Sequence, residues 1–165
     1  MFYLKTVVER SMHYWLIKSE PTTFSIHDLA HSKKKTTCWE GVRNYQARNF
    51  LQAMKKGDRA IFYHSNAKPP AAVGIVEVVK ESYPDHFAWK EGHKYQDIKA
   101  SPEKPIWAMV DVKLVQIFPK EISLEQLRGV KALEGLELLR RGSRLSVHPV
   151  SATHFKVFER LAKQK

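Results

Sequence analysis

The sequence predicts an α+β domain whose sheet is curled and mostly antiparallel or mixed. Short strands and helices do not alternate regularly along the chain, as they do in doubly wound folds. Residues 106–118 place apolar side chains at every second position from Ile106 to Leu114, which is typical of a half-buried strand. Residues 44–56 instead repeat apolar side chains at helical spacing. Together these patterns favour one sheet with helices packed against it.

The first strand and first helix are predicted close to the start of the domain. Residues 14–18 are rich in aromatic and branched side chains, and the strand they predict ends before Pro21. Ser25 and Asp28 have the spacing of a capping box, so we expect a short helix through Leu29.

A second helix is predicted from about residue 44 to 56, after the polar loop that holds Lys33 to Lys35. Gly57 is expected to end this helix. Residues 59–64 and 73–80 then predict two strands that are joined by a Pro-rich turn. The apolar face of the helix consists of Ala47, Phe50, Leu51 and Met54.

Residues 83–105 are polar, aromatic and irregular, which predicts a long loop. Loops of this length inside compact domains are often functional. After the strand at 106–118, Ser123 and Gln126 again have capping-box spacing. Three elements complete the prediction: a helical stretch from about Lys131 to Gly142, a strand at 144–150, and a helix capped by Ser151 that buries Phe155, Phe158 and Leu161.

The totals fit one domain. The chain has 165 residues, of which 43% are hydrophobic and 27% charged, so a core can form without disulfides. Cys38 is the single cysteine, and no apolar run approaches the ~20 residues of a membrane span. We expect residues 1–12 to form a short N-terminal extension and residues 13–165 to form the domain.

The net charge of +11 results from 28 basic and 17 acidic residues. A chain this basic favours polyanions, of which nucleic acid is the most common. Charge that serves solubility, or that contacts anionic lipid, is the competing interpretation. Charge by itself therefore favours a nucleic-acid partner only modestly.

Five segments of the chain form a distinctive set, and the longest of them is Trp39-Glu40-Gly41-Val42-Arg43-Asn44-Tyr45-Gln46-Ala47-Arg48-Asn49-Phe50. The other four segments cover residues 14–21, 62–66, 73–78 and 140–147. In their residues and in their order along the chain, these segments resemble the signature of the EVE-domain family, and the resemblance extends from about His13 to the last helix.

The resemblance implies a PUA-like fold, a mixed or antiparallel β-pseudobarrel with flanking helices. It also implies kinship with YTH domains, which read N6-methyladenine through an aromatic cage. The implied function is non-catalytic binding of DNA or RNA, with a modified base such as methylated or hydroxymethylated cytosine held in an aromatic pocket. We expect no cofactor, no bound metal, no membrane contact, a monomer, and a location in the cytoplasm of a bacterium or the nucleus of a eukaryote.

Trp39 is the first candidate for the wall of such a pocket. An aromatic ring replaces a stacking partner of a base held outside its stack, which stabilises the complex by ~1–3 kcal/mol. The competing role is a core tryptophan, and Trp39 is preferred because YTH domains have a tryptophan in the corresponding loop. Trp107 is a second candidate wall, although its place on an alternating strand suits a core residue at least as well.

Lys18-Ser19-Glu20 resembles the Lys-Ser-Asn of YTH domains, where the third residue bonds the base edge. A carboxylate only accepts hydrogen bonds, so Glu20 would favour an edge with donors, such as the amino group of cytosine. Its competing role is an ion pair with Lys18 or Arg43. Ser65 and Asn66 complete the candidate pocket, with a simple turn as the equal alternative.

The candidate contacts to the nucleic-acid backbone are arginines. Those near Gly142 suit phosphate oxygens, which accept paired N–H donors. Charge at a helix C-terminus would equally explain the first two of them. The full set is Arg43, Arg48, Arg140, Arg141 and Arg144.

Known catalytic patterns are missing from the sequence, including the G-x-S-x-G elbow, the P-loop, the dinucleotide fingerprint and zinc-ligand spacings. Cys38 is expected to be an inert thiol. Two alternatives stay open. One is a hydrolase of modified nucleosides that uses Lys18 and Glu20 for acid–base chemistry. The other is a general basic RNA-binding module without a base pocket.

Overall fold

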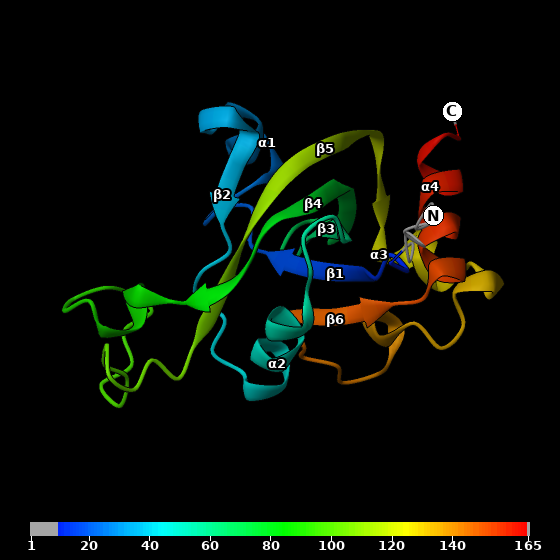
Figure 1. Cartoon of the computed structure of the whole chain (residues 1–165). Helices are drawn as coiled ribbons and strands as arrows, with labels where there is room; N and C mark the ends of the chain where they lie inside the picture. Colours follow the sequence, from blue (N-terminus) through cyan, green and yellow to red (C-terminus); the bar gives the residue numbers. More distant parts are fainter. Residues whose placement is uncertain (1–9, 165) are drawn as a thin grey trace, which may run out of the picture.

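A computed structural model describes residues 10–164 and contains one mixed sheet with helices packed around it (Figure 1). Most of the predicted 1–12 extension lies outside the described residues. The strands are β1 (Tyr14–Ser19), β2 (Thr36–Cys38), β3 (Arg59–His64), β4 (Ala71–Pro84), β5 (Ala108–Ser123) and β6 (Val147–Val150). The helices are α1 (Ile26–His31), α2 (Tyr45–Ala53), α3 (Leu124–Arg128) and α4 (Ala152–Ala162).

The sheet has the strand order β2-β5-β4-β3-β1-β6. β1 runs parallel to β3, and the other neighbouring pairs are antiparallel. Register shifts along the β4–β5 pair let these two long strands bend, since each irregularity increases the local twist. The predicted α+β class with a mixed sheet is confirmed, and the sheet stays open between β2 and β6 in the part of the chain that is described.

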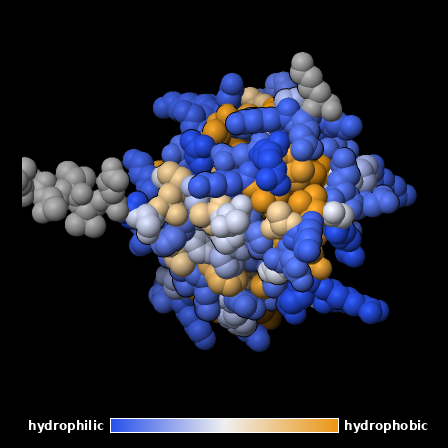
Figure 2. Space-filling model, turned by 90° about the vertical axis from the view of Figure 1, so that its right-hand side faces the viewer, coloured by the Kyte–Doolittle hydropathy of each residue, from blue (hydrophilic) through white to orange (hydrophobic). Residues whose placement is uncertain are grey.

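Both faces of the sheet are buried, which explains the nearly continuous apolar runs of its central strands. In β1, Trp15 and Ile17 belong to a core cluster beneath α1 and α2, whereas Leu16 belongs to a second cluster. Phe155 and Phe158 of α4 close that second cluster. Figure 2 shows the side of the molecule that faces right in Figure 1, where hydrophilic side chains surround smaller hydrophobic areas.

Several local predictions need correction. The helical stretch at 131–142 is wrong: two 3₁₀ turns, Lys131–Leu133 and Glu137–Leu139, occupy it instead. Gly135 between them has φ +87°, a left-handed conformation that interrupts a helix. The last strand begins at Val147 rather than at residue 144. The short strand β2 and the 3₁₀ turns at Lys33–Lys35 and His86–Trp89 were not predicted, because three or four residues carry no periodicity.

Asp58 joins the start of the described chain to the sheet. Its carboxylate, 1% exposed, accepts the Trp15 indole N–H at 3.1 Å and the Lys55 backbone N–H at 3.0 Å. Arg10 forms an ion pair with the same carboxylate at 2.9 Å. The last residues before β1 are therefore tied to the domain by a buried acceptor.

His64 couples the end of β3 to α1 through its neutral ring. Its Nε2 atom accepts the backbone N–H of Ile26 at 3.1 Å, so that nitrogen carries no proton. Burial lowers the pKa of His64 from its ordinary value of 6.5, and the neighbouring His27 lowers it further. Burial also lowers the pKa of His148 in β6.

These two histidines predict a loss of stability in mild acid. A histidine whose pKa is lower in the folded state stabilises the fold fully above the unfolded value of about 6.5, and less as the pH falls below it. We expect the Tm to fall by several degrees between pH 7.5 and pH 5.5, as measured by thermal unfolding. His64→Gln keeps an acceptor for Ile26 and should reduce this fall; an unchanged pH dependence would contradict the assignment.

Candidate functional site

A cleft of about 1050 Å³ opens at the carboxyl end of β1, where five separate parts of the chain meet. β1 and the turn after it form one wall, and β2 with the loop that follows it forms another. The turn after β3, the middle of the long segment at 85–107 and the residues just before β6 complete it. The lining includes Lys18, Ser19, Glu20, Phe24, Cys38, Trp39, Gly41, Ser65, Asn66, Lys94, Tyr95 and Arg144.

Trp39 lines this cleft while most of its indole is packed in the core. Its side chain is 7% exposed, and its ring meets Phe62 edge-on at 5.2 Å between centroids. Its backbone N–H donates to the Val110 carbonyl at 2.7 Å. Core packing and this hydrogen bond hold the ring in place, and a small part of it faces the cleft.

The buried carboxylate of Asp85 fixes the loop that carries Trp39. Asp85 is 0% exposed and accepts the backbone N–H of Gly41 at 2.9 Å and of Phe87 at 3.0 Å. Arg43 forms an ion pair with it at 2.8 Å and donates to the Tyr95 carbonyl at 2.7 Å. The interaction thus ties the Trp39 loop to the 85–107 segment.

Gly41 is required where this loop meets Tyr95. Its φ is +81°, and a Cβ at this position would lie 2.5 Å from a ring carbon of Tyr95. The glycine lets the ring of Tyr95 approach the backbone closely. Tyr95 lines the cleft together with Trp39 and Phe24, and sequence reasoning missed Tyr95 because it lies in an irregular segment.

The polar end of the cleft is organised by Glu20 and Asn66. The Asn66 amide donates to Glu20 Oε1 at 2.8 Å. Neither of the expected ion pairs of Glu20, with Lys18 or with Arg43, occurs in residues 10–164. The Ser19 hydroxyl donates to the Phe24 carbonyl at 2.7 Å, and its oxygen lone pairs remain able to accept.

Lys18 brings a half-buried ammonium group to the cleft. Burial lowers the pKa of Lys18, and the Glu137 carboxylate partly opposes this effect. The ion pairs in the described part of the chain do not include Lys18. Its charge is consequently available to a negatively charged or electron-rich group in the cleft.

Cys38 is not prepared to act as a nucleophile. Burial raises the pKa of its thiol to about 12, and the nearby Glu40 carboxylate contributes to the increase. The Sγ atom lies 3.5 Å from Glu40 Oε2. At neutral pH the thiol is protonated, and the thiolate is the reactive form.

Trp107 does not line the cleft, so its prediction as a second wall is wrong. Its side chain is 6% exposed and packs with Ala88 and Ala100 in a small cluster beneath the 85–107 segment. The ring stacks on Tyr45 at 4.9 Å, and its indole N–H donates to Asp97 at 2.8 Å. The core alternative applies, because Trp107 lies just before β5 and is buried against Ala88, Ala100 and Tyr45.

The five candidate arginines occupy different environments. Arg144 lines the cleft, whereas Arg140 is exposed and ion-paired with Glu137 at 2.8 Å, and Arg141 is exposed. Arg48 donates to the Ile106 carbonyl at 3.0 Å and to the neighbouring Asn49. Arg43 and Arg48 use most of their N–H groups inside the protein, including bonds to the Tyr95 and Ile106 carbonyls of the 85–107 segment.

The model of the EVE domain matches residues 13–161. This chain belongs to the EVE family. Rat thymocyte nuclear protein 1 is 44% identical to this EVE domain over 92% of the chain and 74% of the relative. The predicted family is thereby confirmed.

Two solved structures show how closely the fold of this EVE domain matches its relatives. The human THYN1 protein in complex with 5-methylcytosine containing DNA superposes with a TM-score of 0.89 at 39% identity, over 93% of this chain and 99% of that one. Protein PSPTO5229 from Pseudomonas syringae gives a TM-score of 0.87 at 45% identity, over 90% and 99%. Within residues 10–164, no helix has the length and apolar character needed to cross a membrane.

Removing the Asp85 carboxylate from its pair with Arg43 should destabilise the fold strongly. Asp85→Ala leaves Arg43 and two backbone N–H groups without their acceptor, and breaking a buried ion pair costs about 3–5 kcal/mol. We expect a lower Tm and faster hydrogen exchange at residues 39–43 of the EVE domain.

The matched control for this substitution is a surface ion pair. Lys55→Met removes the pair with Glu81, whose atoms are 3.5 Å apart and whose side chains are about half exposed. Such pairs contribute about 0–1 kcal/mol. Equal effects of the two substitutions would contradict the role of Asp85.

Proposed function

We propose that this EVE domain binds nucleic acid without catalysing a reaction and holds one modified base, a methylated or hydroxymethylated cytosine, in the Trp39 cleft. The observation that carries the proposal is the cleft itself, in which an anchored indole and Tyr95 lie near the Glu20 acceptor. The solved complex of human THYN1 with DNA containing 5-methylcytosine supports DNA as the nucleic acid.

Two of the aromatic rings that line the cleft, Trp39 and Tyr95, suit the faces of a base. A base taken out of its stack loses its neighbours, and aromatic side chains restore part of that stacking. Trp39 is held by Phe62 and by Val110, so it is already in place before a base enters. Preorganisation of this kind reduces the entropy lost on binding.

The Glu20 carboxylate suits the amino edge of cytosine. Asn66 occupies Oε1 and orients the group, while the second oxygen is left to accept from an exocyclic amino group. Adenine also presents an amino group, so the shape of the cleft must contribute to the choice of base. A methyl group adds ~0.8 kcal/mol when buried, which corresponds to only a few-fold preference.

Contacts to phosphates supply much of the affinity in this proposal. Lys18 and Arg144 line the cleft, and Lys94 stands at its margin on the 85–107 segment. Arg140 and Arg141 lie nearby in sequence on the surface. Because these contacts release counterions, binding should weaken steeply with salt.

Two alternatives make different predictions. A hydrolase of modified nucleosides would use Lys18 and Glu20, and it would release product when incubated with such nucleosides. The hydrogen bond from Asn66 to Glu20 suits a fixed acceptor in a binding site. A general basic RNA-binding module would ignore the modification and would keep its affinity after Trp39→Ala.

The cellular location that we propose is taken from the names of the relatives. The vertebrate relatives are named as nuclear proteins, so we propose the nucleus for a eukaryotic chain and the cytoplasm for a bacterial one. We further propose that the domain acts as a monomer.

A panel of matched oligonucleotides tests the function directly. We expect the tightest binding to 5-methylcytosine or 5-hydroxymethylcytosine, with weaker binding to N6-methyladenine and to unmodified DNA, measured by fluorescence anisotropy at fixed salt. Trp39→Ala should weaken binding of the modified strand by ~1–3 kcal/mol through lost stacking. Trp39→Phe, which retains a ring, distinguishes lost stacking from damage to the core.

Glu20→Gln tests the readout of the base edge. The amide can keep its bond with Asn66, but it then presents an N–H donor toward the amino group of cytosine. We expect a loss of ~1–3 kcal/mol for cytosine-derived bases and little change in the Tm. An unchanged base preference across the panel would remove Glu20 from the site.

A further inference from the structure

The segment between β4 and β5 contains a tight turn, Asp97 to Ala100, whose two outer residues are fixed to the protein. The Asp97 backbone N–H donates to the Ala88 carbonyl at 2.7 Å, and its carboxylate accepts the Trp107 indole N–H at 2.8 Å. Ala100 donates to the Asp97 carbonyl at 2.9 Å and is buried beside Ala88 and Trp107. The turn is therefore held from both ends.

The two central residues of this turn face solvent. Ile98 is 91% exposed, and Lys99 beside it is also exposed. The Lys99 backbone N–H donates to Asp97 Oδ1 at 3.0 Å, which fixes the outer part of the turn as well. The exposed side chain of Ile98 contributes no buried apolar area to the fold, so a partner that covers it gains the full hydrophobic stabilisation.

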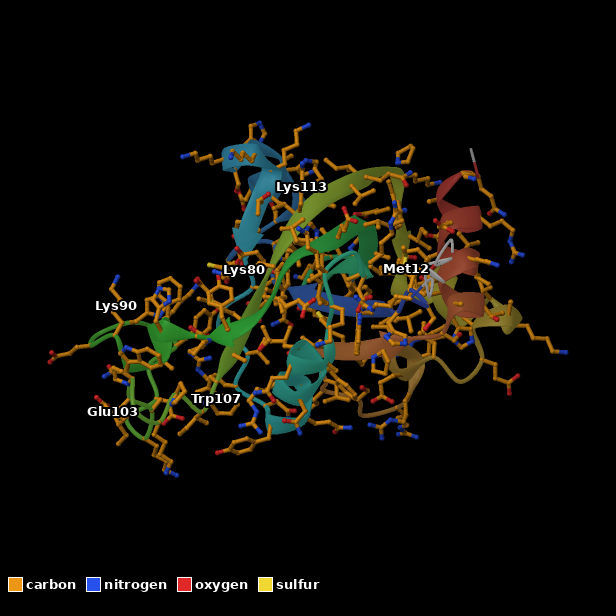
Figure 3. The ribbon with its side chains drawn as sticks, in the orientation of Figure 1. Met12, Lys80, Lys90, Glu103, Trp107 and Lys113 are labelled. Carbon is orange, nitrogen blue, oxygen red and sulfur yellow. The ribbon has the colours of Figure 1, made fainter. Side chains whose placement is uncertain are left out.

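The turn lies close in sequence to residues that line the cleft. The same segment contributes Lys94 and Tyr95 to the lining, and Ile98 follows three residues after Tyr95. Figure 1 shows that this segment projects beyond the sheet. In Figure 3, Lys90 and Glu103 mark its outer part and Trp107 lies at its base. A nucleic acid with one base in the cleft would therefore meet this projection.

The charges around Ile98 suit a polyanion. Lys94 and Lys99 flank it, whereas the partly exposed Asp97 carboxylate accepts the Trp107 indole N–H, and this hydrogen bond lowers the pKa of Asp97. The exposed acidic residues of the segment, Glu91 and Glu103, stand at least five positions away in sequence. The carboxylate beside Ile98, then, is already engaged by the Trp107 indole N–H and the Lys99 backbone N–H.

We propose that Ile98 is a wedge that enters the base stack of a DNA duplex, at the gap left when the modified base moves into the Trp39 cleft. This inference rests on the proposed function. Extracting a base from a duplex sacrifices its pairing and stacking. An apolar side chain inserted between base steps fills the space and covers apolar surface that would otherwise meet water. Lys94 and Lys99 then lie against the flanking phosphates.

Ile98→Ala distinguishes a wedge from an ordinary contact. The protein is titrated with the same 5-methylcytosine sequence as a duplex and as a single strand, because only the duplex has a stack to open. We expect the variant to bind the duplex about tenfold more weakly, because apolar area is removed from the contact. Its affinity for the single strand should equal that of the protein without the substitution. Its Tm should not change, since the side chain is exposed.

The matched control is Val115→Ala, which shortens another exposed apolar side chain, 41% exposed and located on β5 away from the cleft lining. It should leave both affinities unchanged.

A 2-aminopurine placed beside the modified base provides a second measurement, because its fluorescence rises when stacking is lost. The fluorescence should increase when the protein binds, and it should increase less with Ile98→Ala.

The outcomes separate the two proposals. Unchanged duplex affinity in Ile98→Ala, or equal losses on duplex and single strand, would overturn the wedge while the base reader stands. If the protein without the substitution does not prefer the modified base in either duplex or single-stranded DNA, both proposals are wrong.

Discussion

The buried ion pair between Asp85 and Arg43 is the interaction on which the arrangement of the cleft depends. Asp85 accepts from the Gly41 backbone and from Arg43, and Arg43 also donates to the Tyr95 carbonyl. Buried charges are tolerated when they are paired and hydrogen-bonded, as they are here. One carboxylate thus joins the loop before α2 to a segment that begins more than forty positions later in the chain.

This arrangement gives the cleft two kinds of wall. Trp39 is rigid because the core holds it, whereas Tyr95 belongs to a segment outside the main sheet and its backbone carbonyl accepts a hydrogen bond from Arg43. The polar end combines an oriented carboxylate, Glu20, with the half-buried ammonium group of Lys18. A fixed acceptor next to a cation suits a ligand that presents both donors and negative charge. A nucleotide has that chemistry.

The 85–107 segment also takes up hydrogen bonds from two of the candidate arginines. Arg43 and Arg48 donate to backbone carbonyls, and Arg43 also pairs with Asp85. The guanidinium group of Arg43 lies over the Trp107 ring, and that of Arg48 lies over the Tyr45 ring. They stabilise the base of the projection that carries Ile98. Net charge alone therefore overstates the number of cations that face a partner.

Much of the fold was predictable from sequence because it depends on local patterns. The capping boxes at Ser25 and Ser123, the cap at Ser151 and the strand at Arg59–His64 depend on neighbouring residues, and each occurs in the structure. The order of the predicted elements likewise indicated the α+β class, and the family resemblance grouped Trp39, Lys18 and Glu20 as one candidate site. The structure places these three residues on the lining of one cleft.

The rest was decided by contacts between residues distant in the chain. The sequence near Trp107 does not show that its indole N–H donates to Asp97. Nor does it show that Tyr95, rather than Trp107, lines the cleft. Whether Arg43 meets a ligand or Asp85 depends on which long-range partner lies within reach. Sequence periodicity records which side chains are buried and on which face, whereas only the folded chain determines which polar group each buried residue meets.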